Sequence, residues 1–292
     1  MARSVEEGDI LPGGAAPFIG SCRYVVALDY DGTLRSPEGA PVPEPFLRLM
    51  AEARPYGVRW GINTGRSLGY LCEELLGCLT ELPDFICTTE RFAYMADERG
   101  IVRPATEFNR ESYEANALLR RELGEPLAAE MARIRRLHPE WEWCMAPNDP
   151  LSVQAKDTAT MDGIAPLLQP FVDALPGVAM QRASRFMRLS DARYNKATAL
   201  AYVMEQWGVD GAHLFAMGDG HNDLDVFTRF PESYFGCPAD AHPEIRELMP
   251  QMGGHVSESR GVVGLLRRWM EELVLPESGK CGINCQQMSV SS

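Results

Sequence analysis

The chain lacks long apolar runs, and no stretch reaches the roughly 20 apolar residues that a bilayer-spanning helix needs. Long basic runs are also missing: 28 Lys and Arg residues stand against 41 Asp and Glu residues, for a formal net charge of −13. These absences argue against a membrane partner and against non-specific nucleic-acid binding. With 292 residues, 45% of them hydrophobic, the chain can still bury a sizeable core.

Cysteine pairs of the CxxC type are missing as well. The eight cysteines are Cys22, Cys72, Cys78, Cys87, Cys144, Cys237, Cys281 and Cys285. Several lie in apolar runs, where a free thiol acts as a small core residue. Cys281 and Cys285 lack the further ligands that a zinc site requires. We therefore expect a reduced, cytoplasmic protein.

The two ends of the chain show no pattern of regular structure. Residues 1–22 lack the basic-then-apolar order of a signal peptide and are expected to form a flexible leader. Residues 276–292 are polar without periodicity and are expected to be a disordered tail. The sequence between them has no internal repeat and no low-complexity tract.

Apolar runs that alternate with helical patterns predict a parallel sheet. Strands are expected at Tyr24–Leu28, Val58–Ile62 and Phe85–Cys87, with helical spacing of apolar residues between them. The alternation resumes at His213–Met217 and Tyr234–Cys237. This βαβ order predicts an α/β fold with a Rossmann-like parallel-sheet core and helices on its faces.

The middle of the chain has a different pattern. Extended pieces are mixed with two expected helices, near Ser112–Leu123 and Leu127–Leu137, separated by Gly124 and Pro126. We interpret this part as an inserted α+β domain of ordinary size. The predicted division is a catalytic core over 23–86 and 189–275 and an inserted cap over 87–188.

The segment Asp29-Tyr30-Asp31-Gly32-Thr33 follows the first expected strand directly. Two carboxylates one residue apart raise each other's pKa unless a cation lies between them. A hard divalent cation with oxygen ligands, Mg²⁺ first, would relieve this repulsion. The alternative is an ordinary turn, because Asp and Gly are common turn residues.

Three polar loops are expected at the ends of strands: Asp29–Thr33, Thr64–Arg66 and Asp219–Asp223. In an open parallel sheet, ligands bind beyond the carboxyl ends of the strands. The three loops should therefore meet at one edge of the sheet, although they are far apart in sequence.

With these loops in order, the chain resembles the haloacid dehalogenase-like phosphohydrolase superfamily. Its four motifs are Asp29-Tyr30-Asp31-Gly32-Thr33, Thr64, Lys196 and Gly218-Asp219-Gly220-His221-Asn222-Asp223. The insertion lies between the second and third motifs, as in the type II (C2) capped branch with its Cof-like and sucrose-phosphate-phosphatase-like enzymes. The resemblance covers about Tyr24 to Leu273.

The resemblance implies a role for each motif. Asp29 would be the nucleophile that forms an aspartyl-phosphate intermediate. Asp31 would act as the general acid and base, and its backbone carbonyl would bind the metal. Thr64 would hydrogen-bond the transferring phosphoryl group, and Lys196 would offset its charge. Taken alone, Lys196 could also be a solvated lysine at a helix start.

The resemblance also implies Mg²⁺ as cofactor. Asp29 and Asp219 would ligate the ion, while Asn222 and Asp223 would hold its waters or surroundings. Beside Thr64, Gly65 and Arg66 are candidate substrate-binding residues, although Arg66 could instead join its helix to the cap.

Other polar residues have less certain roles. His221 is expected to be exposed and noncatalytic, and Trp141 and Trp143 are expected in the core of the cap. One residue of a basic group could face the active site; the group is Arg182, Arg185, Arg188 and Lys156. Where relatives often carry an Asn-Gly pair, this chain has Thr88-Thr89-Glu90-Arg91.

The implied function is a Mg²⁺-dependent phosphatase acting on a small phosphorylated metabolite, with a sugar phosphate as the first expectation. One alternative is phosphoryl transfer within a sugar, as in phosphomannomutase relatives. Leu28–Thr33 also resembles the first motif of trehalose-phosphate phosphatases. A different class is a catalytically silent binding or regulatory protein on the same fold. The oligomeric state is not predicted.

Overall fold

The structure is a computed structural model that describes residues 21–35, 42–75, 79, 82–97, 100, 102–146, 149–259 and 261–276. Most of the predicted leader (1–22) and nearly all of the predicted tail (276–292) lie outside the described residues. In the described part, no helix is both long and apolar enough to cross a membrane.

The larger of two sheets has eight strands in the order β12-β11-β10-β1-β2-β3-β4-β5. Its strands are β1 (Tyr24–Leu28), β2 (Val58–Asn63), β3 (Phe85–Thr88), β4 (Phe92–Ala96), β5 (Val102–Pro104), β10 (Leu214–Met217), β11 (Tyr234–Cys237) and β12 (His255–Val256). Neighbours from β12 to β3 are parallel, whereas β4 and β5 pair antiparallel at one edge. The predicted α/β fold with a parallel-sheet core is confirmed.

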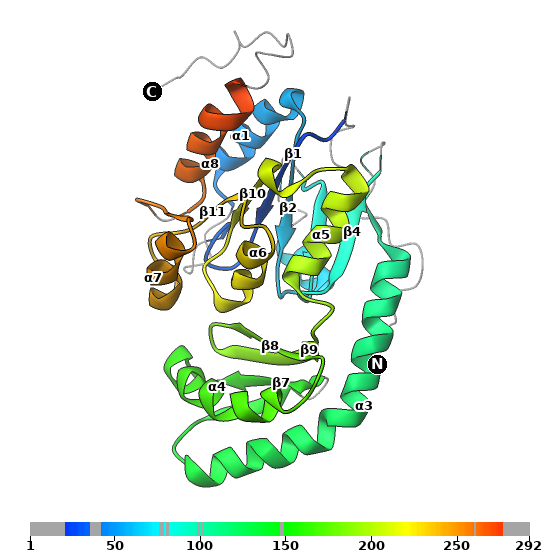
Figure 1. The fold of residues 1–292 in the computed structure, drawn as a ribbon, viewed down its shortest axis with the longest axis vertical. Coiled ribbons are helices and arrows are strands. Elements are labelled where there is room, and N and C mark those ends of the chain that lie inside the picture. Colours follow the sequence, from blue (N-terminus) through cyan, green and yellow to red (C-terminus); the bar gives the residue numbers. More distant parts are fainter. Residues whose placement is uncertain are drawn as a thin grey trace.

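Helices cover both faces of this sheet, as the run of buried residues in β1 requires. Tyr24, Val26 and Leu28 face α1 and α8, whereas Val25 and Ala27 face α5, α6 and α7 (Figure 1). The helices and helical turns of this unit are α1 (Glu44–Ala53), η1 (Arg54–Tyr56), α2 (Leu68–Glu74), α5 (Lys196–Trp207), η3 (Gly211–His213), η4 (His221–Asp223), α6 (Leu224–Arg229), α7 (Pro243–Gln251), α8 (Val263–Trp269) and the π-helical stretch η5 (Met270–Val274).

A smaller antiparallel sheet, in the order β6-β7-β9-β8, lies below the large one in Figure 1. Its elements are α3 (Thr106–Leu137), β6 (Trp143–Ala146), β7 (Asp149–Ala155), α4 (Thr158–Asp173), β8 (Val178–Ala183) and β9 (Phe186–Asp191). The helices α3 and α4 pack on one face of this sheet and enclose a separate hydrophobic core. Trp141 and Trp143 pack against that core, as predicted.

The sheets divide the chain differently from the predicted boundary at residue 87. Strands β4 and β5 belong to the larger sheet, although their residues were assigned to the cap. Thr89 and Glu90 adopt left-handed backbone angles, with φ of 49° and 64°, and reverse the chain between β3 and β4. Non-glycine residues rarely take these angles, so the sequence carried no turn signal there.

The prediction of two separate helices around Pro126 was wrong, because α3 is one continuous helix. Proline lacks an N–H and crowds the preceding turn, which can kink a helix without ending it. Figure 1 shows that α3 bends between its upper and lower halves. Leu123 and Leu127, on either side of the break, are both buried in the small core, and this packing offsets the local cost.

Candidate active site

The turn after β1 brings Asp29 against the end of β10. The Asp29 amide donates to the Met217 carbonyl at 2.9 Å, and Gly32 takes a left-handed φ of 80°. A Cβ atom on Gly32 would lie 2.3 Å from Oδ2 of Asp219. Glycine is therefore required twice, for the turn and for the close approach of the fourth motif.

Lys196 lies at the centre of the site with a side chain that is only 1% exposed. Its Nζ donates to Oδ1 of Asp29 at 2.6 Å and to Oδ1 of Asp223 at 2.7 Å. Burial opposes the charge of Lys196, but Asp223 and Asp29 outweigh burial and raise its pKa. The alternative of a solvated lysine is wrong, and Lys196 is a fixed cation between two carboxylates.

Asp29, Asp219 and Asp223 form a cluster in which one carboxylate oxygen of each lies within 4.8 Å of the others. Burial is the main reason that the pKa of Asp219 rises to about 7, and the charge of Asp223 adds to it. Burial also raises the pKa of Asp29, against the opposing effect of Lys196. One lysine does not neutralise three carboxylates, and their all-oxygen donor set fits a hard cation such as Mg²⁺.

Thr64 and Arg66 follow β2 and face the turn after β1. Thr64 is buried, and its Oγ1 accepts a hydrogen bond from the Arg66 amide at 3.1 Å. The Arg66 guanidinium donates to both carboxylate oxygens of Asp31, at 2.6 and 3.1 Å. Arg66 therefore pairs with the predicted acid–base residue, and its side chain makes no described hydrogen bond to the cap.

Sequence reasoning did not assign a role to Glu90, which the structure places beside the fourth motif. Glu90 is 5% exposed, and its Oε1 accepts from Nδ2 of Asn222 at 3.0 Å. Its Oε2 is buried without a hydrogen-bond partner among the described residues. The departure of Thr88–Arg91 from the Asn-Gly pair of relatives was the one feature of the sequence that pointed to Glu90.

Asn63 is a second residue that sequence reasoning missed. It ends β2, is buried, and donates from Nδ2 to the backbone carbonyl of Lys196 at 3.1 Å. This bond ties the first residue of α5 to the end of a strand. The Asn195 side chain caps the same helix by accepting from the Thr198 amide at 2.9 Å, so Lys196 is positioned from two sides.

Of the basic group in the insertion, Arg188 reaches the core. Its Nη1 donates to the Thr89 carbonyl at 3.3 Å, and its Nε donates to Asp149 at 3.0 Å. The other three members of the group are Arg182, paired with Asp162; Arg185, which is exposed; and Lys156, 3.6 Å from Glu142.

Two further arginines lie beside Arg188. Arg91 is 7% exposed, and its Nε is buried without a hydrogen-bond partner among the described residues. Burial, and next the charge of Arg188, lowers the pKa of Arg91 to about 10. Nε of Arg120 is likewise buried without a partner among the described residues. The charges of Asp149 act on all three guanidinium groups, so this boundary between the two sheets is locally cationic in an acidic protein.

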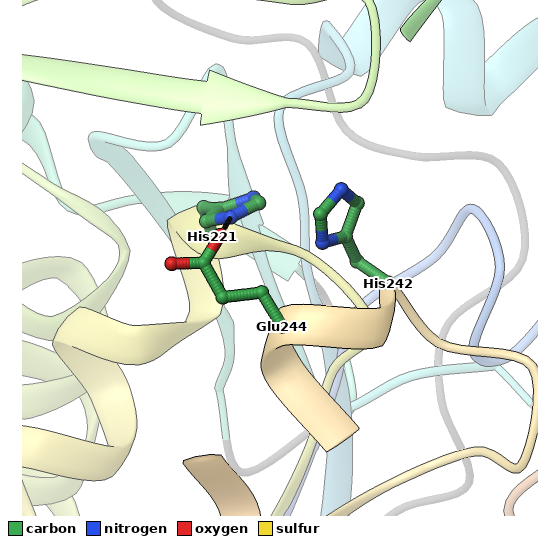
Figure 2. Close-up of side chains that lie close together, drawn as sticks. All are labelled: His221, His242 and Glu244. Atoms are coloured by element: carbon green, nitrogen blue, oxygen red, sulfur yellow. Dashed lines mark hydrogen bonds and ion pairs between the residues drawn. The ribbon is translucent and has the colours of Figure 1, made fainter. Parts of the chain in front are cut away.

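The prediction that His221 is exposed was wrong. The side chain is 18% exposed, and Nε2 lies 2.9 Å from Oε2 of Glu244. Figure 2 shows His221 facing Glu244 and the ring of His242, whose centroid is 4.5 Å away. His221 is not part of the carboxylate cluster, although Asp219 and Asp223 on the same loop are. It forms a second polar cluster with His242 and Glu244.

This fold, with Asp29, Thr64 and Asp219 after the carboxyl ends of strands of the large sheet and Lys196 at the start of α5, is that of the haloacid dehalogenase-like hydrolases. The family model for haloacid dehalogenase-like hydrolases matches residues 161–266, which include the third and fourth motifs. The match agrees with the resemblance over the part of the chain that carries the third and fourth motifs.

Individual proteins are also similar to this chain. Phosphoglycolate phosphatase of Methanothermobacter thermautotrophicus is 29% identical over 84 residues, which are 29% of this chain and 37% of that protein. Sucrose-phosphatase from Synechocystis sp. PCC6803, solved with sucrose and phosphate, aligns with a TM-score of 0.63 at 16% identity, over 86% of this chain and 98% of that one. A phosphatase of the same superfamily from Bacteroides thetaiotaomicron gives 0.52 at 19% identity, over 87% and 96%. Likeness at these identities concerns the fold.

Proposed function

We propose that the protein is a phosphoric monoester hydrolase that uses Mg²⁺ and forms an aspartyl-phosphate on Asp29. The carrying observation is the bridge from Nζ of Lys196 to Asp29 and Asp223, beside the third carboxylate of Asp219. The phosphatase names of the similar proteins support this reading. A silent binding protein is less favoured, because neither the aspartates nor the lysine of the motifs is missing.

The proposed nucleophile, Asp29, is bound by Lys196 through only one of its two carboxylate oxygens. Because Lys196 binds Oδ1 of Asp29, the other carboxylate oxygen is left to attack phosphorus. Asp29, Asp219 and Asp223 would hold Mg²⁺, with the Asp31 carbonyl and Asn222 contributing nearby. When bound, the ion would neutralise the carboxylates and the charge that develops on the phosphoryl oxygens.

The remaining residues orient the phosphoryl group and move a proton. The Thr64 oxygen accepts from the Arg66 amide, which leaves its own O–H to donate to a phosphoryl oxygen. Gly65 and Arg66 lie beside it as substrate-binding residues. Asp31 protonates the leaving oxygen and then activates water, and it must first release the Arg66 guanidinium.

The substrate is a small phosphorylated metabolite, with a sugar phosphate as the expected class. The small sheet with α3 and α4 acts as a cap that selects the leaving group. Arg91, Arg120 and Arg188 lie where it meets the core, and they favour a leaving group that carries a carboxylate or second phosphate. We place the enzyme in the cytoplasm, with no nucleic-acid or membrane partner.

The test is phosphate release from para-nitrophenyl phosphate by the full chain with Mg²⁺. Wild-type protein should release phosphate, and Asp29→Asn should abolish release while Asp173→Asn, at an exposed aspartate of α4, keeps it. Robust turnover by Asp29→Asn would contradict a mechanism in which Asp29 is the nucleophile. Product analysis with a hexose phosphate separates hydrolysis, which gives free phosphate, from mutase chemistry, which gives an isomerised phosphate.

A further inference from the structure

A second group of potential metal ligands lies outside the carboxylate cluster. His221 from η4 and His242 and Glu244 from the start of α7 each offer one ligand atom, and these atoms lie within 4.8 Å of one another. Figure 2 shows the two imidazoles and the carboxylate gathered between the two segments. Two of the five histidines of the chain are thus brought together with an acidic residue.

The surroundings of His242 fit a metal ligand. Its Nδ1 is buried without a hydrogen-bond partner among the described residues. On the other side of the ring, Nε2 lies 3.8 Å from Oδ1 of Asp162. Histidines that bind metals commonly direct their other ring nitrogen at a carboxylate.

We propose that His221, His242 and Glu244 bind a divalent transition metal of the Zn²⁺ type, at a site distinct from the Mg²⁺ site. Two imidazoles and one carboxylate are donors that Zn²⁺ accepts, with a fourth position left for water. Ligand atoms about 2.1 Å from a tetrahedral ion lie about 3.4 Å apart. The observed separations run from 2.9 Å for His221 and Glu244 to at most 4.8 Å, so small side-chain rotations close the site.

The site has a structural consequence, because Asp162 belongs to α4 of the small unit and the three ligands belong to the large one. Asp162 also pairs with Arg182 on β8, the strand next to η4. A metal held by His242 strengthens the interaction of that imidazole with Asp162. Metal binding therefore favours the arrangement in which the small sheet lies against the fourth motif.

The test is titration of Zn²⁺ and Co²⁺ into tag-free, ion-free full-length protein kept reduced and saturated with Mg²⁺. Calorimetry should show one Zn²⁺ site that survives Mg²⁺, and Co²⁺ should give the visible bands of tetrahedral nitrogen and oxygen ligation without thiolate charge transfer. His242→Ala should weaken Zn²⁺ binding on the order of 100-fold, and Asp162→Asn by about 10-fold.

The matched control is His138→Ala, because His138 lies 3.4 Å from Glu140 as another histidine–glutamate pair. It should leave the affinity unchanged, and circular dichroism should show that every variant is folded. The proposal is overturned if Zn²⁺ binds His242→Ala as tightly as wild type, if Mg²⁺ displaces it, or if no Zn²⁺ site is found. None of these readouts depends on phosphatase activity, so failure here is distinct from failure of the proposed function.

Discussion

Lys196 shows how one residue organises the site. Its charge is buried, and a buried charge persists only when it is paired; the two carboxylates at 2.6 and 2.7 Å supply the pairing. Removing the lysine would leave Asp29 and Asp223 uncompensated beside Asp219. The same cation that stabilises the free site would also offset the charge of an arriving phosphoryl group.

The raised pKa of Asp219 predicts a pH dependence of Mg²⁺ binding. Its folded-state pKa of about 7 lies above the usual 3.8, so ion-free protein keeps this proton until the pH approaches 7. Mg²⁺ must displace the proton below that pH. The affinity for Mg²⁺ should therefore rise about tenfold per pH unit between pH 5 and 7 for the proton on Asp219, and more steeply where Asp29, whose pKa is also raised by burial, gives up a proton as well.

Calorimetric titration of Mg²⁺ at several pH values checks this. Asp219→Asn should bind more weakly and lose most of the pH step. An affinity that stays constant between pH 5 and 7 would contradict the raised pKa. The proton released on binding, measured in buffers of different ionisation enthalpy, gives a second reading of the same exchange.

At the scale of single residues, the motif residues could be predicted from the sequence, whereas the residues that hold them in place could not. Asp29, Thr64, Lys196 and Asp219 could be found because each follows a strand or begins a helix at a recognisable spacing. Glu90 gains its position from Asn222, which is 132 residues away. No local pattern encodes a partner that only the folded chain brings into contact.

At the scale of elements, the turn that follows β1 leaves the least room for substitution, because it packs directly against the fourth motif at Asp219. Gly32→Ala would strain a left-handed backbone by about 1–2 kcal/mol and place its Cβ against Asp219. We expect lower stability and at least tenfold weaker Mg²⁺ binding, because the carboxylate must move.

Gly177→Ala is the matched control, since Gly177 has a φ of 77° but nothing within 4 Å of an added Cβ. It should lower the melting temperature to a similar degree and leave Mg²⁺ binding unchanged. Thermal unfolding and Mg²⁺ titration of both variants check this. Equal Mg²⁺ affinities in the two variants would mean that the contact with Asp219 does not matter.

The strands and most helices of the larger unit followed from apolar periodicity, because each buries a regular face. The exceptions had physical causes outside local pattern. Packing of Leu123 and Leu127 in one core overrode the break at Pro126. Thr89 and Glu90 turn the chain without a glycine, so no local turn signal placed β4 in the large sheet.

At the scale of the whole molecule, the guanidinium cluster at the boundary of the two units bears on substrate choice. Arg188→Gln should lower kcat/KM for 3-phosphoglycerate about 10- to 100-fold, because hydrogen bonds to charged groups contribute about 1.5–3 kcal/mol. Glycerol 3-phosphate has a hydroxymethyl group in place of the carboxylate, so its kcat/KM should change much less.

Steady-state kinetics with the two esters checks this, with the exposed Arg185→Gln as control. Equal losses for both esters in Arg188→Gln would show that the arginine supports the fold of the cap and does not read the leaving group. This outcome would leave the proposed hydrolysis itself untouched.

The account rests on a phosphoryl group carried by Asp29, and trapping that group tests it most directly. Enzyme turning over para-nitrophenyl phosphate with Mg²⁺ is quenched and treated with borohydride, which reduces an acyl phosphate to an alcohol. Mass spectrometry of the peptide that contains Tyr24–Leu28 and the following turn should then find homoserine at position 29. The modification should be absent without substrate and absent in Asp29→Asn. Steady phosphate release with an unmodified Asp29 under trapping conditions would contradict the account.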